Sequence, residues 1–371
     1  MPHDAPSAFT TDIAWPISLE ASVHAPGAMS DDPVPYAGPD SFTFVRLRVR
    51  DADGVVGDGF TGRFLAPEVA AFLNRLSDTI NDLGDDTIDK AMRQFNPRGM
   101  TGVVVSALSA LEVALTDLAA RRQGLPVWRM LGGKRDAAPV HVTCGFPSLD
   151  DDALVDACGA EIARGAAGVK VLVGARGRSV AEDAARVTRV RDAIGPEAEL
   201  IADANCAWSL ESAREMVQAV ARVNLAWLEE PVRGNDPKEL AALVGMGQVP
   251  IGAGQMEQSD NRFAQLIDAG VSVIQPNAVF AGGFGAAIRA AQGARAAGCQ
   301  VSPAAGWDAI NLHWMCGAME HGTVELHRAQ SRISRLLRPS HVEDNGMLRL
   351  SDVPGLGLDP DEEALAECRV G

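Results

Sequence analysis

The sequence predicts an α/β protein in which an N-terminal α+β unit precedes a closed parallel barrel. From Val140 onward, short apolar strands alternate with helical segments, and this alternation continues for eight strands. The first third instead combines strand-like alternation and a hairpin turn with long helical segments. No G-x-G-x-x-G turn follows the first strand of the alternating region, which argues against a doubly wound open sheet.

In the first third, residues 42–50 alternate between apolar side chains and arginines, as expected for a strand. DADG at 51–54 is a hairpin turn signal. Residues 67–83 are expected to be helical. A stronger helix is predicted for 103–123, where apolar residues recur at helical spacing and Gly124 provides a stop.

The barrel strands are expected to be short and apolar, with helices between them. After about residue 335 the chain is rich in Pro, Gly and Asp and is expected to be mostly loop that packs back on the N-terminal unit. The eight expected strands are PVHVTCG, GVKVLVG, AELIADAN, LAWLEEPV, VPIGAGQ, VSVIQPN, GCQVSPAAG and GTVELHR.

Composition is that of an ordinary globular protein, with 47% hydrophobic and 22% charged residues and a formal net charge of −16. No Lys/Arg-rich run is present, so nucleic acid is not an expected partner. The six cysteines show no C-x-x-C spacing, and neither a signal peptide nor a membrane-spanning stretch is expected. These features favour a cytoplasmic enzyme without nucleic-acid or membrane partners.

Polar residues follow several of the expected strands. The carboxyl ends of barrel strands meet at one mouth, where chemistry is found in such folds. Acidic groups that converge there repel one another unless a divalent cation lies between them, and all-oxygen ligation favours Mg²⁺. A single strand-end Asp203 would also suit a helix cap, but WLEEP one strand later favours a metal ligand. The strand-end residues are Lys170, Asp203, Glu229 with Glu230, Gln255 with Glu257, and Asn277.

Here the chain resembles the enolase superfamily, and specifically its mandelate racemase/muconate-lactonizing branch. The resemblance implies a (β/α)7β TIM-like barrel under an N-terminal α+β capping domain. The expected boundaries are residues 1–135 for the capping domain, 136–335 for the barrel, and 336–371 for a C-terminal segment that packs back on the capping domain. The motifs that carry the resemblance are SALSALEVALTDLAARRQGLPVWRMLGG (106–133), GVKVLVG (168–174), IADANCAW (201–208), WLEEPV (227–232), VPIGAGQ (249–255) and IQPNAVFAGG (274–283).

The resemblance also implies Mg²⁺-assisted removal of a proton α to a carboxylate. A divalent cation at both carboxylate oxygens would stabilise the resulting anion, and a positioned base would take the proton. Asp203 and Glu229 match the first two metal ligands, with Glu230 as a neighbouring carboxylate that supports them. Lys170 matches the first lysine of the K-x-K motif and is the expected base. A small-molecule carboxylate is the expected substrate, and a homo-oligomer the expected assembly.

The sequence departs from the family pattern at several positions. Leu172 replaces the second lysine of K-x-K, which is the usual base of the family. Gln255 stands where a third acidic ligand is expected, and we favour Glu257, two residues on, as that ligand. Asn277 stands at the position of the Asp of the family's His–Asp dyad, and Ala305 or Gly306 at that of its His. His313 is expected to be a packed or capping histidine.

Three functions are compatible with this pattern. The favoured one is dehydration of a hydroxylated carboxylate such as a sugar acid, with Lys170 as the base. The second is a racemisation, epimerisation or cycloisomerisation, and the third is a barrel that has lost catalysis and serves as a binding protein. Residues expected to contact substrate or orient ligands are Arg63 and Arg98 of the capping unit, with Trp307, Asn205 and Asn277 of the barrel. His141 and Cys144 flank the end of the first barrel strand. The sequence is compatible with either of two roles for them, lining the pocket or packing in the core.

Overall fold

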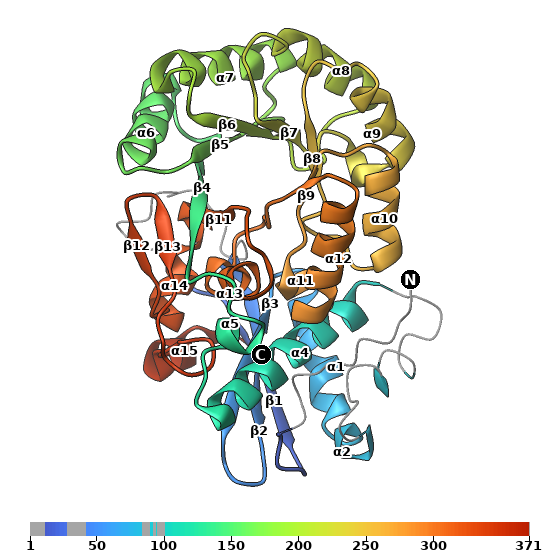
Figure 1. The fold of residues 1–371 in the computed structure, drawn as a ribbon, viewed down its shortest axis with the longest axis vertical. Helices are drawn as coiled ribbons and strands as arrows, with labels where there is room; N and C mark the ends of the chain where they lie inside the picture. Colours follow the sequence, from blue (N-terminus) through green and yellow to red (C-terminus); the bar gives the residue numbers. More distant parts are fainter. Residues whose placement is uncertain (1–11, 28–41, 84–89, 92–93, 95–100, 371) are drawn as a thin grey trace.

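The structure is a computed structural model that describes residues 12–27, 42–83, 90–91, 94 and 101–370. Figure 1 shows a ring of strands and helices, coloured green to orange, with a smaller sheet in blue below it. The ring is the barrel, and the smaller sheet belongs to the N-terminal unit. The α/β fold class predicted from the sequence is therefore confirmed. Arg98 lies outside the described residues.

The N-terminal unit is a four-stranded antiparallel sheet with the strand order β14-β1-β2-β3, packed against helices. Arg46 in the middle of β2 is buried rather than solvent-facing, because Asp58 accepts a hydrogen bond from its Nε at 2.8 Å and Glu362 accepts two from its other nitrogens. The elements are β1 (Ser18–His24), β2 (Phe44–Arg50), β3 (Val56–Thr61), α1 (Ala66–Leu76), α2 (Ile80–Leu83), α4 (Val103–Gln123) and α5 (Val127–Met130).

Helix α4 is the central helix of this unit. It ends at Gly124, whose φ of 66° is the left-handed conformation that glycine adopts most easily. Contrary to the expectation from the sequence, this helix is long and apolar enough to cross a membrane by length and composition. However, 89% of its most apolar window is buried inside the protein, as in a core helix.

The barrel contains all eight strands expected from the sequence. Seven follow one another as parallel neighbours from β4 to β10, and β11 pairs in parallel with β4 on its other side. The strands are β4 (Ala137–Gly145), β5 (Gly168–Leu172), β6 (Glu199–Asp203), β7 (Trp227–Glu229), β8 (Ile251–Ala253), β9 (Val273–Ile274), β10 (Gln300–Val301) and β11 (Val324–His327). The helices are α6 (Asp151–Ala163), α7 (Val180–Ile194), α8 (Leu210–Ala219), α9 (Pro237–Val244), α10 (Asp260–Asp268), α11 (Ala278–Ala281), α12 (Phe284–Ala296) and α13 (Asp308–Ala318).

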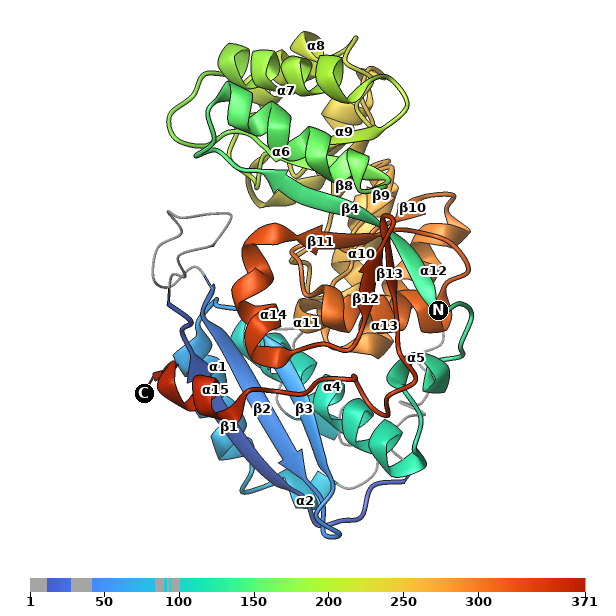
Figure 2. The same cartoon turned by 90° about the vertical axis from the view of Figure 1, so that its left-hand side faces the viewer.

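The C-terminal segment contacts both parts of the protein. Strands β12 (Val342–Asp344) and β13 (Met347–Arg349) form a hairpin that pairs antiparallel with β4 of the barrel. Strand β14 (Arg369–Val370) pairs with β1 of the N-terminal sheet. Figure 2 shows helix α14 (Ser331–Leu337) beside the barrel, and α15 (Glu362–Glu367) beside the blue sheet.

The N-terminal unit packs against the segments that follow barrel strands. Thr61 at the end of β3 donates a hydrogen bond to the backbone oxygen of Val279 at 3.0 Å. The ring of Phe60 stacks on Trp307 with 5.9 Å between centroids. Glu112 of α4 accepts hydrogen bonds from the first two backbone N–H groups of α12, at 2.8 and 3.0 Å. These contacts place the unit over the carboxyl ends of the strands, where the polar residues gather.

Candidate active site

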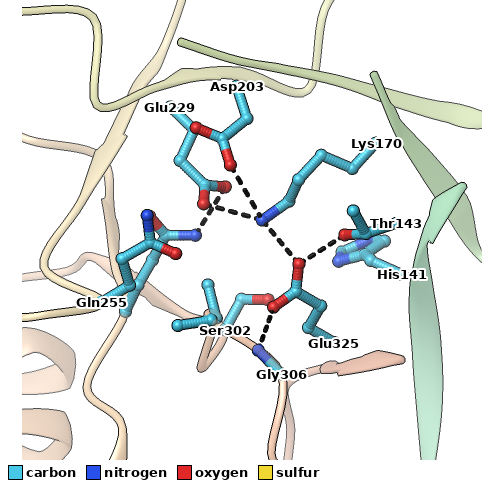
Figure 3. A network of polar contacts seen from close by, with 12 residues as sticks. His141, Thr143, Lys170, Asp203, Glu229, Gln255, Ser302, Gly306 and Glu325 are labelled. Atoms are coloured by element: carbon cyan, nitrogen blue, oxygen red, sulfur yellow. Dashed lines mark hydrogen bonds and ion pairs between the residues drawn. The ribbon is translucent and has the colours of Figure 1, made fainter. Parts of the chain in front are cut away.

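Charged side chains from four barrel strands meet at the carboxyl-terminal half of the barrel (Figure 3). Lys170 comes from β5, Asp203 ends β6, Glu229 ends β7, and Glu325 lies on β11. All four side chains are buried, with relative exposures of 5% or less. Parallel strands bring their ends to the same mouth, which explains how residues so distant in sequence meet.

Lys170 is the only cation among the side chains drawn together in Figure 3. Its Nζ lies 2.7 Å from Glu229 Oε1, 3.0 Å from Glu325 Oε1 and 3.8 Å from Asp203 Oδ2. Burial alone would lower the pKa of this lysine, but the attraction of the three carboxylates outweighs it and raises the pKa above its ordinary value. Lys170 is therefore an ammonium in this structure.

Glu229 accepts hydrogen bonds on both carboxylate oxygens. Oε1 accepts from Lys170, while Oε2 accepts from Trp227 Nε1 at 3.0 Å and from Gln275 Nε2 at 2.8 Å. Gln275 was not singled out in the sequence, although it stands in the strand-end run IQPN. These donors fix the carboxylate in one orientation, with Oε1 turned toward Lys170 and Asp203.

Asp203 carries the least compensated charge of the cluster. Its Oδ1 accepts a hydrogen bond from the backbone N–H of Asn205 at 2.9 Å, which shapes the turn after β6. Burial, followed by repulsion from Glu229, raises its pKa well above the ordinary value, and Lys170 opposes this only in part. A buried carboxylate in this state would be stabilised by a further cation nearby.

Glu230 points into a separate hydrogen-bond network beside the cluster. It accepts from Asn235 Nδ2 at 2.8 Å and from Gln255 Nε2 at 2.6 Å. Burial raises its pKa, and these hydrogen bonds partly counteract that shift. Because the amide nitrogen of Gln255 is engaged with Glu230, the carbonyl oxygen is the atom left to coordinate a cation.

Glu257 is placed differently from Gln255. Both of its carboxylate oxygens pair with Arg262, each at 2.9 Å. Within the part of the chain that the structure describes, no three His, Cys, Asp or Glu side chains are placed to bind one metal ion. The structure thus does not bring Glu257 together with Asp203 and Glu229, while Gln255 lies on their side of the site in Figure 3.

Glu325 and His327 belong to the site but were not identified from the sequence. Glu325 accepts hydrogen bonds from Thr143 Oγ1 and from the backbone N–H of Gly306. Burial would raise its pKa, but Lys170 and His327 lower it to about 2. The available signal was the pattern VELH, in which two polar residues at alternate positions face the same side of an apolar strand.

A cavity of about 790 Å³ lies above this cluster, between the strand ends and the N-terminal unit. Sequence-predicted residues that line it include Arg63, Asp203, Asn205, Gln255, Glu257 and Trp307. Glu325 and His327 line it as well. The cavity is therefore bounded by both units, as a substrate site between a barrel and its cap should be.

Comparison with known proteins agrees with this architecture. Residues 153–364 match the family described as "Enolase C-terminal domain-like". Residues 20–132 match the "Mandelate racemase / muconate lactonizing enzyme, N-terminal domain". The chain belongs to the mandelate racemase/muconate lactonizing branch of the enolase superfamily. The resemblance inferred from the sequence motifs is confirmed.

Several relatives in this branch are similar over much of the chain. L-talarate/galactarate dehydratase of Salmonella typhimurium is 33% identical over 244 residues, which are 64% of this chain and 61% of that protein. 3,6-anhydro-alpha-L-galactonate cycloisomerase of Streptomyces coelicolor is 26% identical over 370 residues, 97% of each protein. The crystal structure of the Salmonella enzyme liganded with Mg and L-lyxarohydroxamate has a TM-score of 0.82 at 26% identity, covering 97% of this chain and 93% of that chain.

The remaining sequence-predicted residues of this enolase-superfamily chain have structural contacts. Asn277 is buried, accepts from the N–H of Val279 at 2.9 Å and donates to the oxygen of Ala304 at 2.6 Å, so it holds two strand-end loops together. His313 Nδ1 accepts from the N–H of Trp128 at 3.2 Å and its Nε2 donates to the oxygen of Leu356 at 3.1 Å. It is a packed histidine, as expected. Leu172, in place of the second lysine of K-x-K, lines the cavity.

Two further positions near the first barrel strand are also explained. His141 pairs with Glu199 through Nε2 and contacts Thr323 Oγ1 at 3.0 Å through Nδ1. The Sγ atoms of Cys144 and Cys158 lie 3.8 Å apart between β4 and α6. Neither His141 nor Cys144 lines the cavity above the carboxylate cluster. Cys144 lines a second cavity, together with Glu161 and Arg328.

Proposed function

We propose that this chain catalyses cation-dependent removal of the proton α to the carboxylate of a hydroxylated acid, followed by loss of the β-hydroxyl as water. The observation that carries the proposal is the set of buried carboxylates, Asp203, Glu229 and Glu325, which face one lysine beneath a cavity. Relatives named as dehydratases of talarate, galactarate, arabinonate and galactonate support an acid sugar as the substrate class.

The site fits a magnesium ion by charge and by ligand type. Three buried carboxylates share a single ammonium, whose Nζ lies 2.7 Å from Glu229 and 3.8 Å from Asp203, and this excess of negative charge supports a cation site here. The residues that would hold Mg²⁺ are Asp203, Glu229 and the carbonyl oxygen of Gln255. When bound, Mg²⁺ supplies Lewis-acid stabilisation of the negative charge that develops on the substrate carboxylate.

The protein's own groups would position the substrate and exclude water. The ammonium of Lys170 holds Glu229 and Glu325 in position beneath the cavity. The role of Lys170 as the base remains a prediction. To act as a base, Lys170 would first have to lose a proton, and the three surrounding carboxylates oppose that loss. Arg63 and Trp307 line the cavity on its cap side and are the proposed contacts for the distal part of the substrate.

A second candidate function is cycloisomerisation of a sugar-acid lactone or anhydro acid. The observation that favours it is the coverage of the Streptomyces coelicolor cycloisomerase, which matches this chain over 97% of its length. Both reactions begin with the same proton abstraction, so the site does not need different ligands. We further propose a cytoplasmic location and a homo-oligomeric assembly, following the sequence-based expectations.

The test is proton exchange in D₂O with Mg²⁺ and a panel of galactarate, D-galactonate, L-arabinonate and L-rhamnonate, followed by NMR. We expect at least one acid to lose its α-proton signal and to form a dehydrated keto acid. Omission of Mg²⁺ is the matched control and should stop both changes. If no acid exchanges or is converted, the proposed function is wrong.

A further inference from the structure

The proposed reaction needs a proton acceptor that faces the cavity and is unprotonated at working pH. Lys170 does not line the cavity, and its Nζ is engaged with Glu229 at 2.7 Å and with Glu325 at 3.0 Å. Within the described part of the chain, seven side chains that carry a titratable or charged group line the cavity. They are Arg63, Asp203, Cys206, Glu230, Glu257, Glu325 and His327.

Three of these seven side chains are carboxylates whose oxygens already accept hydrogen bonds from other groups of the protein. Glu257 is held at both oxygens by Arg262. Glu325 is held by Lys170, Thr143 and a backbone N–H group, and its pKa is about 2, which makes it a poor proton acceptor. Glu230 accepts from two amide side chains.

Three more are excluded by their chemistry. Asp203 is a proposed metal ligand, and its charge is needed to attract the cation. The guanidinium of Arg63 has hydrogen-bond donors but no acceptor. Burial, with repulsion from Glu230, raises the pKa of the Cys206 thiol to about 12, so a thiolate is not available there. His327 is the remaining group.

His327 is placed as a proton acceptor should be. It is the last residue of β11 and lies two residues after Glu325, so the two side chains leave the strand on the same side. Its side chain lines the cavity, and its buried Nδ1 has no hydrogen-bond partner. The ring of Phe146 lies 5.7 Å from its own ring, centroid to centroid, and Leu172 lines the same cavity. A polar group buried without a partner is uncommon, and such groups occur at functional sites.

The surroundings keep this imidazole neutral. Burial is the main effect and lowers its pKa from the ordinary 6.5. The charged groups that act on it are Glu325 on its own strand, Lys170 on β5 and Asp308 at the start of α13. The two carboxylates raise the pKa, while Lys170 lowers it. An uncharged imidazole at neutral pH can accept a proton without first losing one.

We propose that His327 is the base that removes the α-proton in this reaction, an inference that rests on the proposed function. The imidazole takes the proton, and the electron pair of the C–H bond passes into the adjacent carboxylate system. The imidazolium then gives the same proton to the β-hydroxyl oxygen, whose bond to carbon breaks with the electron pair leaving on oxygen. Water departs and a double bond remains between the two carbons, so no other reactant is required.

The experiment compares wild type, His327→Gln, His327→Ala and the control His321→Gln, which changes an exposed histidine just before β11. Each is measured for exchange and conversion of the acid that wild type uses, with Mg²⁺ in D₂O. We expect His327→Gln to be slower in α-proton exchange by roughly 10²–10⁴-fold, the usual contribution of a general base. His321→Gln should match wild type, and added imidazole should partly restore His327→Ala.

The outcomes separate the two proposals. A wild-type chain that exchanges no acid of the panel overturns the proposed function, and this inference falls with it. An active wild type whose His327→Gln variant exchanges within about threefold of it overturns only the role of His327. Should the variants fail to fold, diethyl pyrocarbonate on wild type provides the test. Acylation of His327 that tartrate with Mg²⁺ suppresses supports the inference, and an unmodified His327 beside a modified His321 overturns it.

Discussion

Lys170 Nζ lies 2.7 Å from Glu229 Oε1, and both side chains are buried where the barrel strands end. The pair is not balanced, because Glu325 and Asp203 lie within 3.8 Å of the same ammonium. Buried charges are tolerated only when they are paired. The stability of the protein should therefore depend on the Lys170 ammonium and on any metal ion bound beside it.

Replacement of Lys170 by Met should destabilise the metal-free protein. The substitution leaves the carboxylates of Glu229 and Glu325 buried without their cation, and loss of one partner of a buried pair typically costs about 3–5 kcal/mol. Saturating Mg²⁺ should recover part of this loss. The measurement is the free energy of unfolding in urea with and without Mg²⁺.

The matched control for that measurement is Arg262→Met. Arg262 pairs with Glu257 at 2.9 Å, but its side chain is 29% exposed, so water screens the pair and its loss should cost less than about 1 kcal/mol. Equal stability of the Lys170→Met variant and wild type without Mg²⁺ would show that the ammonium does not compensate the cluster.

The third metal ligand can be identified by calorimetry. Gln255→Ala should weaken Mg²⁺ binding at least about tenfold, which corresponds to about 1.4 kcal/mol, because it removes the carbonyl oxygen that we propose as the third ligand. Gln255→Glu should bind Mg²⁺ more tightly than wild type, since it adds a charge. Glu257→Gln is the control and should leave the affinity unchanged. The reverse pattern would restore Glu257 as the ligand, as the sequence suggested.

The barrel was predictable because its strands and helices are local and periodic. The polar residues at strand ends also predicted that Asp203, Glu229 and Lys170 meet at the barrel mouth, and the structure places these side chains together. Their contacts could not, because the direction of a side chain and the pairing of Glu257 with Arg262 depend on tertiary packing. For the same reason the sequence did not show that the Asn277 side chain bridges two loops, and its role in the site stays a prediction.

Glu325 and His327 show a different limit. The family resemblance directed attention to the second and seventh strands, where Leu172 stands in place of the expected base and Ala305 or Gly306 in place of the dyad histidine. The eighth strand carries two polar residues in alternation, and only the pairing of β11 with β4 brings them beside Lys170. The buried Arg46 was likewise unpredictable, because its partner Glu362 lies near the other end of the chain.

Packing between β3 and α4 can be tested at a glycine. A Cβ at Gly59 would lie 1.9 Å from the backbone oxygen of Ala110, so helix or strand must move to accept it. We expect Gly59→Ala to cost about 3 kcal/mol or more in the free energy of unfolding. Gly159→Ala in α6 is the matched control, since a Cβ there meets nothing within 4 Å and should stabilise by about 0.5–1 kcal/mol. Similar effects of the two variants would contradict the close contact of β3 with α4.

His313 gives a prediction about acid stability. Burial lowers its pKa from 6.5 to about 3 in the folded protein, although the hydrogen bond to Leu356 opposes the shift. The unfolded chain therefore binds a proton below pH 6.5 that the folded protein does not, so the contribution of His313 is complete above pH 6.5 and is lost as the pH falls toward 3. Its loss proceeds at up to about 1.4 kcal/mol per pH unit.

His313→Gln tests this directly, because the amide can still accept from Trp128 and donate to Leu356 but does not titrate. Wild type should lose about 2 kcal/mol more than the variant between pH 6.5 and pH 5, measured as free energies of unfolding in urea at each pH. Groups that titrate in both proteins cancel in the difference, so the pH dependence of that difference belongs to His313 alone. Parallel curves for the two proteins would mean that His313 is protonated in the folded state as readily as in the unfolded one. That result would contradict the lowered pKa and the hydrogen bond that Nδ1 accepts from the N–H of Trp128.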